Sequence, residues 1–203
     1  MPLNQIIRAL LIFGAIHSQL HLANAFQQPP QLLAGSAYIR SKDRFYIISG
    51  IDKDGKNSSQ FFYFDLSVPW PASQPAYEFL PGMSDDWRFS GVASSDGKEI
   101  TCFVNATSGA YTSQYNLSRG SWYRSFIQLP YFSQDIQAVL EPNTGNIFLA
   151  GGSMNQTMMV IYYPADQSFQ QVFLPPDGML GILSYRAVWS PMTNGILYFG
   201  GWP

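Results

Sequence analysis

The chain has 203 residues, a formal net charge of -2 and only 12% charged residues, about half the usual share of roughly 25%. This composition excludes a disordered protein and a coiled coil. The chain has no excess of basic residues, so it lacks the positive charge that binding to nucleic acid requires. Aromatic residues make up 16% of the chain, with 17 glycines and 14 prolines. This combination favours short strands joined by tight turns.

Residues 1–25 are predicted to be a secretory signal peptide. Arg8 is the only charged residue of this segment, an apolar run follows it, and the segment ends in the small-x-small sequence Ala23-Asn24-Ala25. The alternative, a transmembrane anchor, is disfavoured because the apolar run is too short to cross about 30 Å of hydrocarbon. We therefore expect cleavage after Ala25, a secreted chain of residues 26–203, and no membrane span beyond the signal peptide.

Cleavage would remove both histidines, His17 and His21. A mature chain without histidine excludes Ser-His-Asp and Cys-His catalysis and the usual zinc sites. Cys102 is the only cysteine, so no internal disulfide is expected. Because Cys102 lies in an apolar run, it is predicted to be a small buried strand residue rather than a reactive thiol.

Four asparagines of the mature chain begin an Asn-x-Ser/Thr sequence, and this excess over chance predicts N-glycosylation in a eukaryotic secretory pathway. They are Asn57, Asn105, Asn116 and Asn155. The alternative is coincidence, since Asn, Ser and Thr all favour turns.

A plan of about fifty residues repeats along the mature chain, and this is the period of a repeat architecture. One position of the plan recurs at Gly50, Asn105, Gly152 and Gly201, which are 55, 47 and 49 residues apart. Each unit opens with two apolar runs joined by a turn rich in Gly, Asn, Asp or Pro, which is a hairpin signal. The runs are continuous rather than alternating, which suits strands covered on both faces. The units are residues 35–83, 87–132, 133–179 and 180–203, with approximate bounds.

The second half of a unit also repeats. An aromatic residue near the end of a strand is followed six or seven residues later by a second aromatic residue. The pairs are Phe64 and Trp70, Tyr115 and Trp122, and Tyr163 and Phe169. Each of these three units then closes on Leu-Pro, where proline marks a strand end or an outer edge.

This plan resembles the kelch repeat, whose units form the four-stranded blades of a β-propeller. The residues that carry the resemblance occupy its double-glycine, tyrosine and tryptophan positions. They are Gly50, Gly151, Gly152, Gly200, Gly201, Tyr115, Tyr163, Trp70 and Trp122. The second unit departs from the pattern, with Val104-Asn105 in place of both glycines.

The resemblance covers residues 35–203 and implies an all-β fold. The expected architecture is a kelch-type β-propeller of about three and a half four-stranded blades, which is an incomplete propeller. The alternative is an antiparallel sandwich with glycine-rich turns, which would not explain the fixed period.

The kelch family includes galactose oxidase, a copper enzyme whose metal site uses histidines, and the mature chain would have none. No catalytic, cofactor-binding or metal-ligating residue is therefore predicted.

Residues 52–57 carry some oxygen ligands of a calcium loop but not the full set, and we interpret them as a polar hairpin loop. Asp85-Asp86 is the only adjacent acidic pair, interpreted as a solvated loop or turn cap rather than a glycosidase site.

The leading functional hypothesis is a non-catalytic, secreted propeller that binds a protein or a glycan through its loops. The candidate contact residues are 177–180 and 83–88, the latter containing Asp85, Asp86, Trp87 and Arg88. The alternative is the propeller portion of a larger extracellular oxidase or carbohydrate-active enzyme, with catalytic residues outside this chain.

A propeller has no exposed sheet edges only when its ring of blades is closed. The chain is therefore expected to be a fragment of a longer protein, with two copies pairing into seven blades as the alternative.

Overall fold

The structure of the chain is a computed structural model. It describes residues 37–41, 43–51, 54, 57–70, 77–83, 89–106, 109–125, 136–150, 158–173 and 186–199. In these residues the chain forms several antiparallel sheets and no helix, and hence no helix long and apolar enough to cross a membrane. The prediction of an all-β fold is confirmed.

Four sheets are present in the described part of the chain. The first consists of β1 (Ala37–Ser41), β2 (Arg44–Ile51), β3 (Asn57–Asp65) and β4 (Tyr77–Leu80). The second consists of β5 (Phe89–Ala93), β6 (Glu99–Ala106), β7 (Gly109–Asn116) and β8 (Ser121–Ser125). The third consists of β9 (Gln137–Leu140), β10 (Ile147–Ala150), β11 (Met158–Tyr163) and β12 (Ser168–Phe173). The fourth consists of β13 (Arg186–Ser190) and β14 (Gly195–Phe199).

Each sheet begins with a hairpin at a place where the sequence predicts one. The hairpins are β1–β2, β5–β6, β9–β10 and β13–β14. The second and third hairpins turn at Gly97, with φ of 68°, and Gly145, with φ of 78°. Only glycine adopts this left-handed backbone at no steric cost, which explains its place between two apolar runs.

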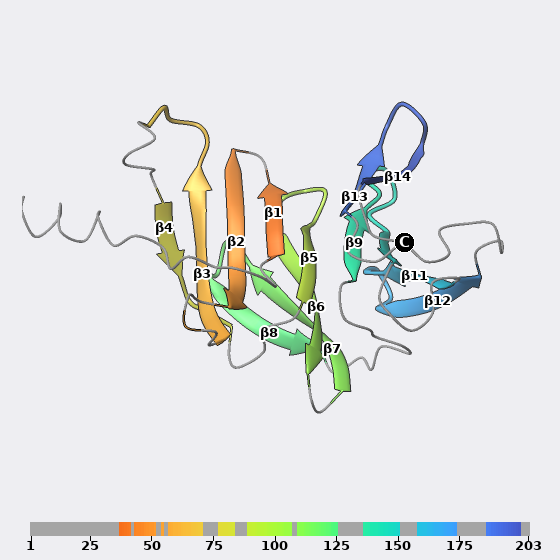
Figure 1. Cartoon of the computed structure of the whole chain (residues 1–203), viewed down its shortest axis with the longest axis horizontal. Helices are drawn as coiled ribbons and strands as arrows, with labels where there is room; N and C mark the ends of the chain where they lie inside the picture. The colour runs from red at the N-terminus through yellow and green to blue at the C-terminus, as the bar shows by residue number, and fades with distance from the viewer. Residues whose placement is uncertain are drawn as a thin grey trace, which may run out of the picture.

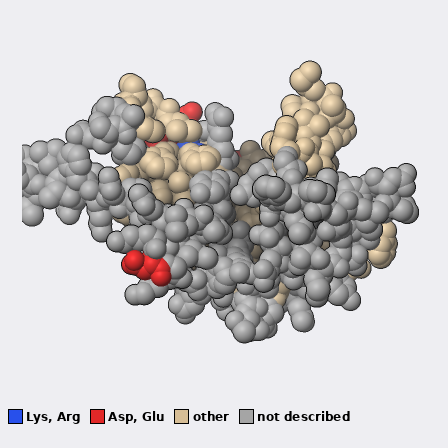
Figure 2. Space-filling model, viewed as in Figure 1, with Lys and Arg blue, Asp and Glu red and all other residues tan. Residues whose placement is uncertain are grey.

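The strands of each sheet follow one another in chain order, so every sheet is an antiparallel meander. The first strands of successive sheets pack side by side, because β1 contacts β5, β5 contacts β9, and β9 contacts β13. In Figure 1 these four strands lie in the middle of the molecule, with β4 on the far left and β12 on the right. This arrangement is compatible with a propeller-like β fold. Charged side chains are sparse among the described residues of the face seen in Figure 2, in keeping with the composition.

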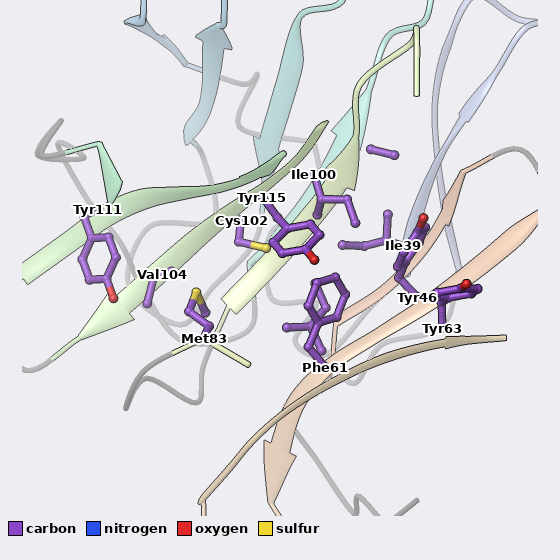
Figure 3. Packing of buried hydrophobic residues seen from close by; sticks show 12 residues of the cluster. Ile39, Tyr46, Phe61, Tyr63, Met83, Ile100, Cys102, Val104, Tyr111 and Tyr115 are labelled. Atoms are coloured by element: carbon purple, nitrogen blue, oxygen red, sulfur yellow. The ribbon is translucent and has the colours of Figure 1, made fainter. Parts of the chain in front are cut away.

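The larger core cluster fills the space between the first and second sheets (Figure 3). Tyr46 and Phe61 of the first sheet meet Ile100 and Cys102 of the second, and none of the four is more than 2% exposed. The prediction that Cys102 is a buried strand residue is confirmed. Its burial raises the pKa of the thiol well above the ordinary value and keeps it protonated.

A second core cluster joins the second sheet to the third. It contains Phe103 of β6 together with Ile147, Leu149 and Tyr162 of the third sheet. Successive side chains of a strand point to opposite faces of the sheet. Cys102 therefore lies in the larger cluster, and its neighbour Phe103 lies in the second one. Coverage of both faces accounts for the continuous apolar runs of the sequence.

Candidate binding surface

The meander order gives the sheets two different ends. One end carries the turns that follow the first and third strands of each sheet, and we call it the turn end. At the opposite end the chain passes from the second strand to the third and from one sheet to the next, and we call it the connection end. The described turns of the turn end are residues 66–70, 94–98, 117–120, 141–146, 164–167 and 191–194. The turns β1–β2, β5–β6 and β13–β14 lie on the upper side of Figure 1.

Aspartates at the turn end cap their own backbone. Asp65 Oδ1 accepts hydrogen bonds from the Ser67 backbone N–H at 2.9 Å and from Ser67 Oγ at 2.5 Å. Asp166 Oδ1 accepts the same two bonds from Ser168, at 3.1 and 2.7 Å. In each case the bonds from serine hold the pKa of the carboxyl below its usual value, because they favour the ionised form.

Two further carboxylates stabilise the hairpin turns of the second and third sheets. Asp96 accepts a hydrogen bond from Ser94 Oγ at 2.7 Å and pairs with Lys98 Nζ at 2.9 Å. Glu141 accepts hydrogen bonds from the backbone N–H of Asn143 at 2.9 Å and of Thr144 at 3.0 Å. Lys98 lowers the pKa of Asp96, and Thr144 lowers that of Glu141. A general acid needs a raised pKa, so these four carboxyls are arranged as turn caps rather than as acid catalysts.

We expect the turn end to make the protein sensitive to acid. The folded pKa values of the four carboxyls lie below the unfolded ones, so their contribution is present above about pH 4 and is lost as the pH falls. The urea midpoint should therefore be lower at pH 3 than at pH 7. In Asp166→Asn this difference should be smaller than in the wild type, because one cap no longer titrates. An equal midpoint at both pH values would contradict the capping role.

The predicted glycosylation sites fall on both ends. Asn116 ends β7 at the turn end, and its Oδ1 accepts hydrogen bonds from Ser118 N and Oγ, both at 3.1 Å, in the same arrangement as Asp65. The amide nitrogen, to which a glycan would be attached, takes no part in these bonds. Asn57 begins β3 and Asn105 lies near the end of β6, both at the connection end, and Asn155 lies outside the described residues.

The chain leaves the first sheet through residues 81–83, which are clamped between two sheets. Trp122 Nε1 donates a hydrogen bond to the Pro81 carbonyl oxygen at 2.7 Å. Gly82 lies against the backbone oxygen of Ser59, and Met83 is buried in the larger core cluster with 4% exposure (Figure 3). Met83 was expected to belong to a contact loop, and this expectation is corrected: it packs between the sheets because the clamp holds its backbone there.

Several residues singled out by the sequence lie outside the described residues. They are Ala25, Asp85, Asp86, Trp87, Arg88, Gly151, Gly152, Gly200, Gly201 and residues 177–180. Gly50 is described in β2, next to a register shift between β2 and β3. The residue before it, Ser49, has φ of 57°, so this strand bends at the position that the kelch resemblance assigns to glycine.

The predicted aromatic pairs of the repeat are in contact in the first and second sheets, and a neighbouring pair is in contact in the third. Trp70 stacks on Phe64 with ring centroids 5.9 Å apart, and Tyr115 and Trp122 lie 5.0 Å apart. In the third sheet the residue stacked on Phe169, at 4.8 Å, is Tyr162 and not Tyr163. The structure thus places the tyrosine of the third unit one residue earlier than the sequence pattern does.

Sequence reasoning did not assign which aromatic residues meet across each junction between sheets. The rings of Phe61 and Tyr115 meet edge to face with centroids 4.8 Å apart, and those of Phe103 and Tyr162 do so at 5.5 Å. Phe148 stacks at 6.0 Å on Trp189 of the fourth sheet. Each junction therefore includes at least one aromatic contact between sheets, and Phe61 also contacts Trp122 at 5.4 Å. The signal available in the sequence was the aromatic content of the second and third strands, but their facing directions depend on the register.

Comparisons with known proteins add a likeness of fold. No protein-family model matches the chain, and no curated protein matches it. The chain is similar to a solved structure described as "Structure of YjhT", with a TM-score of 0.59 and 10% sequence identity. The match covers 80% of this chain and 56% of that one, so this chain spans little more than half the length of that structure. At this identity the likeness concerns the fold alone.

Proposed function

We propose that residues 35–203 form blades of a kelch-type β-propeller, with each four-stranded sheet as one blade. The order of strands within the sheets and the packing of β1, β5, β9 and β13 support this proposal. The recurring tyrosines support it as well, because Tyr115 and Tyr162 both make an edge-to-face contact with a phenylalanine of the preceding sheet.

On this scaffold we propose a secreted, non-catalytic module that binds a protein or a glycan at the connection end. The observation that carries the proposal is the difference between the two ends. The strand bounds leave long connections, residues 126–136 and 174–185, at the connection end. At the turn end most turns are short, and their carboxylates are already bonded to their own backbone. Long loops on a rigid scaffold are the usual carriers of recognition.

Within the connection end, residues 84–88 are our proposed contact segment. They follow the clamp at residues 81–83 and precede β5, so both of their neighbours in the chain belong to packed structure. Anchored ends reduce the entropy that a loop loses on binding. Tryptophan and arginine are also the side chains most enriched at binding hot spots, and this segment contains Trp87 and Arg88.

The proposal is tested with protein recovered from the culture medium of a eukaryotic host, where a secreted chain should begin at Phe26. The probes are an array of defined neutral and acidic oligosaccharides and, in parallel, cross-linking to an extracellular protein extract. The double variant Trp87→Ala with Arg88→Ala should bind at least about tenfold more weakly than the wild type. The control Thr193→Ala, at an exposed turn-end position, should bind normally.

Two results would overturn this assignment: no retained glycan or protein with the wild type, or full binding by the double variant. Chemical conversion of an arrayed oligosaccharide, detected by mass spectrometry, would instead support the carbohydrate-active enzyme as the function.

A further inference from the structure

Asn116 ends β7 in a turn whose cap does not require an amide. Its Oδ1 accepts hydrogen bonds from Ser118 N and Oγ, both at 3.1 Å, and from Arg119 N at 2.8 Å. Asp65 and Asp166 accept the same pair of bonds from a serine two residues on, in the turns after the third strands of the first and third sheets. A carboxylate therefore serves such a turn as an amide does, and asparagine adds only its Nδ2 group.

This Nδ2 group belongs to an Asn-x-Ser sequence at the surface. Ser118 completes the sequence, and the bonds that form the cap use only the Oδ1 of Asn116. Ser118 and Arg119 are exposed and Asn116 is half-buried. A glycan on asparagine is bulky and needs a surface position, and this turn provides one.

An aromatic ring lies beside this position. In the second sheet β7 runs between β6 and β8, and the hydroxyl of Tyr123 on β8 donates a hydrogen bond to Glu99 Oε1 on β6 at 3.0 Å. Asn116 pairs with Glu99, and Gln114 pairs with Tyr123. The ring of Tyr123 therefore crosses β7 between Gln114 and Asn116, on the face of the sheet that carries both side chains.

The ring of Tyr123 is open to solvent and yet held in place. The residue is 42% exposed, and the bond to Glu99 holds the far end of its side chain. Because the ring is already held, a group that packs on it costs little further side-chain entropy. The C–H face of a sugar ring is apolar, and packing it on an aromatic ring removes apolar surface from water.

We propose that Asn116 carries an N-linked glycan and that the first sugar packs on the ring of Tyr123. In the transfer, the amide nitrogen of Asn116 loses one proton and forms a bond to C1 of the sugar. The bond between C1 and the pyrophosphate of a lipid-linked donor breaks, and its electron pair stays on the phosphate oxygen. The host cell supplies the donor and the transferase. The glycan rests on the proposed secretion, because only a chain that enters the secretory pathway meets this donor.

Site mapping of the chain recovered from the medium of a eukaryotic host tests the modification. A peptide N-glycosidase converts each glycosylated asparagine to aspartate, and mass spectrometry detects the change against an untreated sample. The tryptic peptide 99–119 contains both Asn105 and Asn116, and its fragment spectra distinguish them. Asn116 should be converted in the wild type and unconverted in Ser118→Ala. A chain found in the medium with Asn116 unmodified overturns the inference alone, whereas a chain that does not reach the medium overturns the proposed secretion as well.

Melting curves of four glycosylation-competent preparations test the contact with Tyr123. They are the wild type, Asn116→Asp, Tyr123→Ala and the double variant. Asn116→Asp removes the glycan and keeps a cap of the kind that Asp65 forms. The Tm lost on this change should be greater by about 2–4 °C in the wild type than in Tyr123→Ala, the shift of one ordinary contact in a domain of this size. The change in the cap is common to both pairs and cancels.

Tyr163→Ala is the matched control, because Tyr163 also lies near the turn end with its hydroxyl bonded to a neighbouring strand, at Gln170. It belongs to the third sheet, and it should leave the effect of Asn116→Asp on the Tm unchanged. An equal effect of Asn116→Asp with and without Tyr123 overturns the packing of the sugar on this ring.

Discussion

Replacing Gly82 with alanine is expected to lower the free energy of unfolding by about 3 kcal/mol, the upper part of the usual range for overpacking. A Cβ at this position would lie 2.1 Å from the Ser59 carbonyl oxygen, which belongs to the backbone of β3, so the main chain itself has to move. That movement is opposed on both sides, because Pro81 accepts the hydrogen bond from Trp122 and Met83 is buried in the core. Urea denaturation of the wild type and the variant measures the difference.

Gly195→Ala is the matched control for this prediction. The atoms nearest to its added Cβ are the backbone oxygen and the Oγ1 of Thr193, at 3.7 and 3.8 Å, and its backbone is not left-handed. The change in the free energy of unfolding should therefore stay within about 0.5 kcal/mol. If Gly82→Ala costs no more than Gly195→Ala, residues 81–83 are not packed on β3 as the structure places them.

The hairpins and the two-sided burial of the strands could be predicted from the sequence because both depend on local signals. A glycine such as Gly97 or Gly145 between two apolar runs specifies a turn, whatever the rest of the fold does. Continuous apolar runs such as the one around Cys102 indicate cover on both faces, and Cys102 and Phe103 are buried in different clusters.

The residues that join the sheets could not be assigned in this way, because their positions depend on partners far along the chain. Met83 was expected in a contact loop, but it packs in the larger core cluster, two residues after the carbonyl that accepts the hydrogen bond from Trp122. Tyr162 and Tyr163 are adjacent and point to opposite faces of β11. Which of them faces the core is fixed by the pairing of β11 with β10 and β12, and a shift of one residue would exchange them.

This difference between adjacent tyrosines leads to the second large expected effect. Tyr162→Ala should lower the free energy of unfolding by about 3–4 kcal/mol, because Tyr162 is fully buried, stacks on Phe169 and meets Phe103 edge to face. Tyr163→Ala should cost about 1 kcal/mol, since its hydroxyl only donates an exposed hydrogen bond to Gln170 at 2.6 Å. Urea denaturation of the two variants under the same conditions measures both values.

Tyr162→Phe separates the ring from the hydroxyl in this comparison. The Tyr162 hydroxyl is buried and has no hydrogen-bond partner among the described residues, and burying an unpaired polar group is unfavourable. Tyr162→Phe should therefore leave the free energy of unfolding unchanged or raise it, while Tyr162→Ala lowers it. If Tyr163→Ala proves as costly as Tyr162→Ala, the register of β11 is shifted by one residue, and the tyrosine that packs between the second and third sheets is Tyr163, as the sequence pattern indicates.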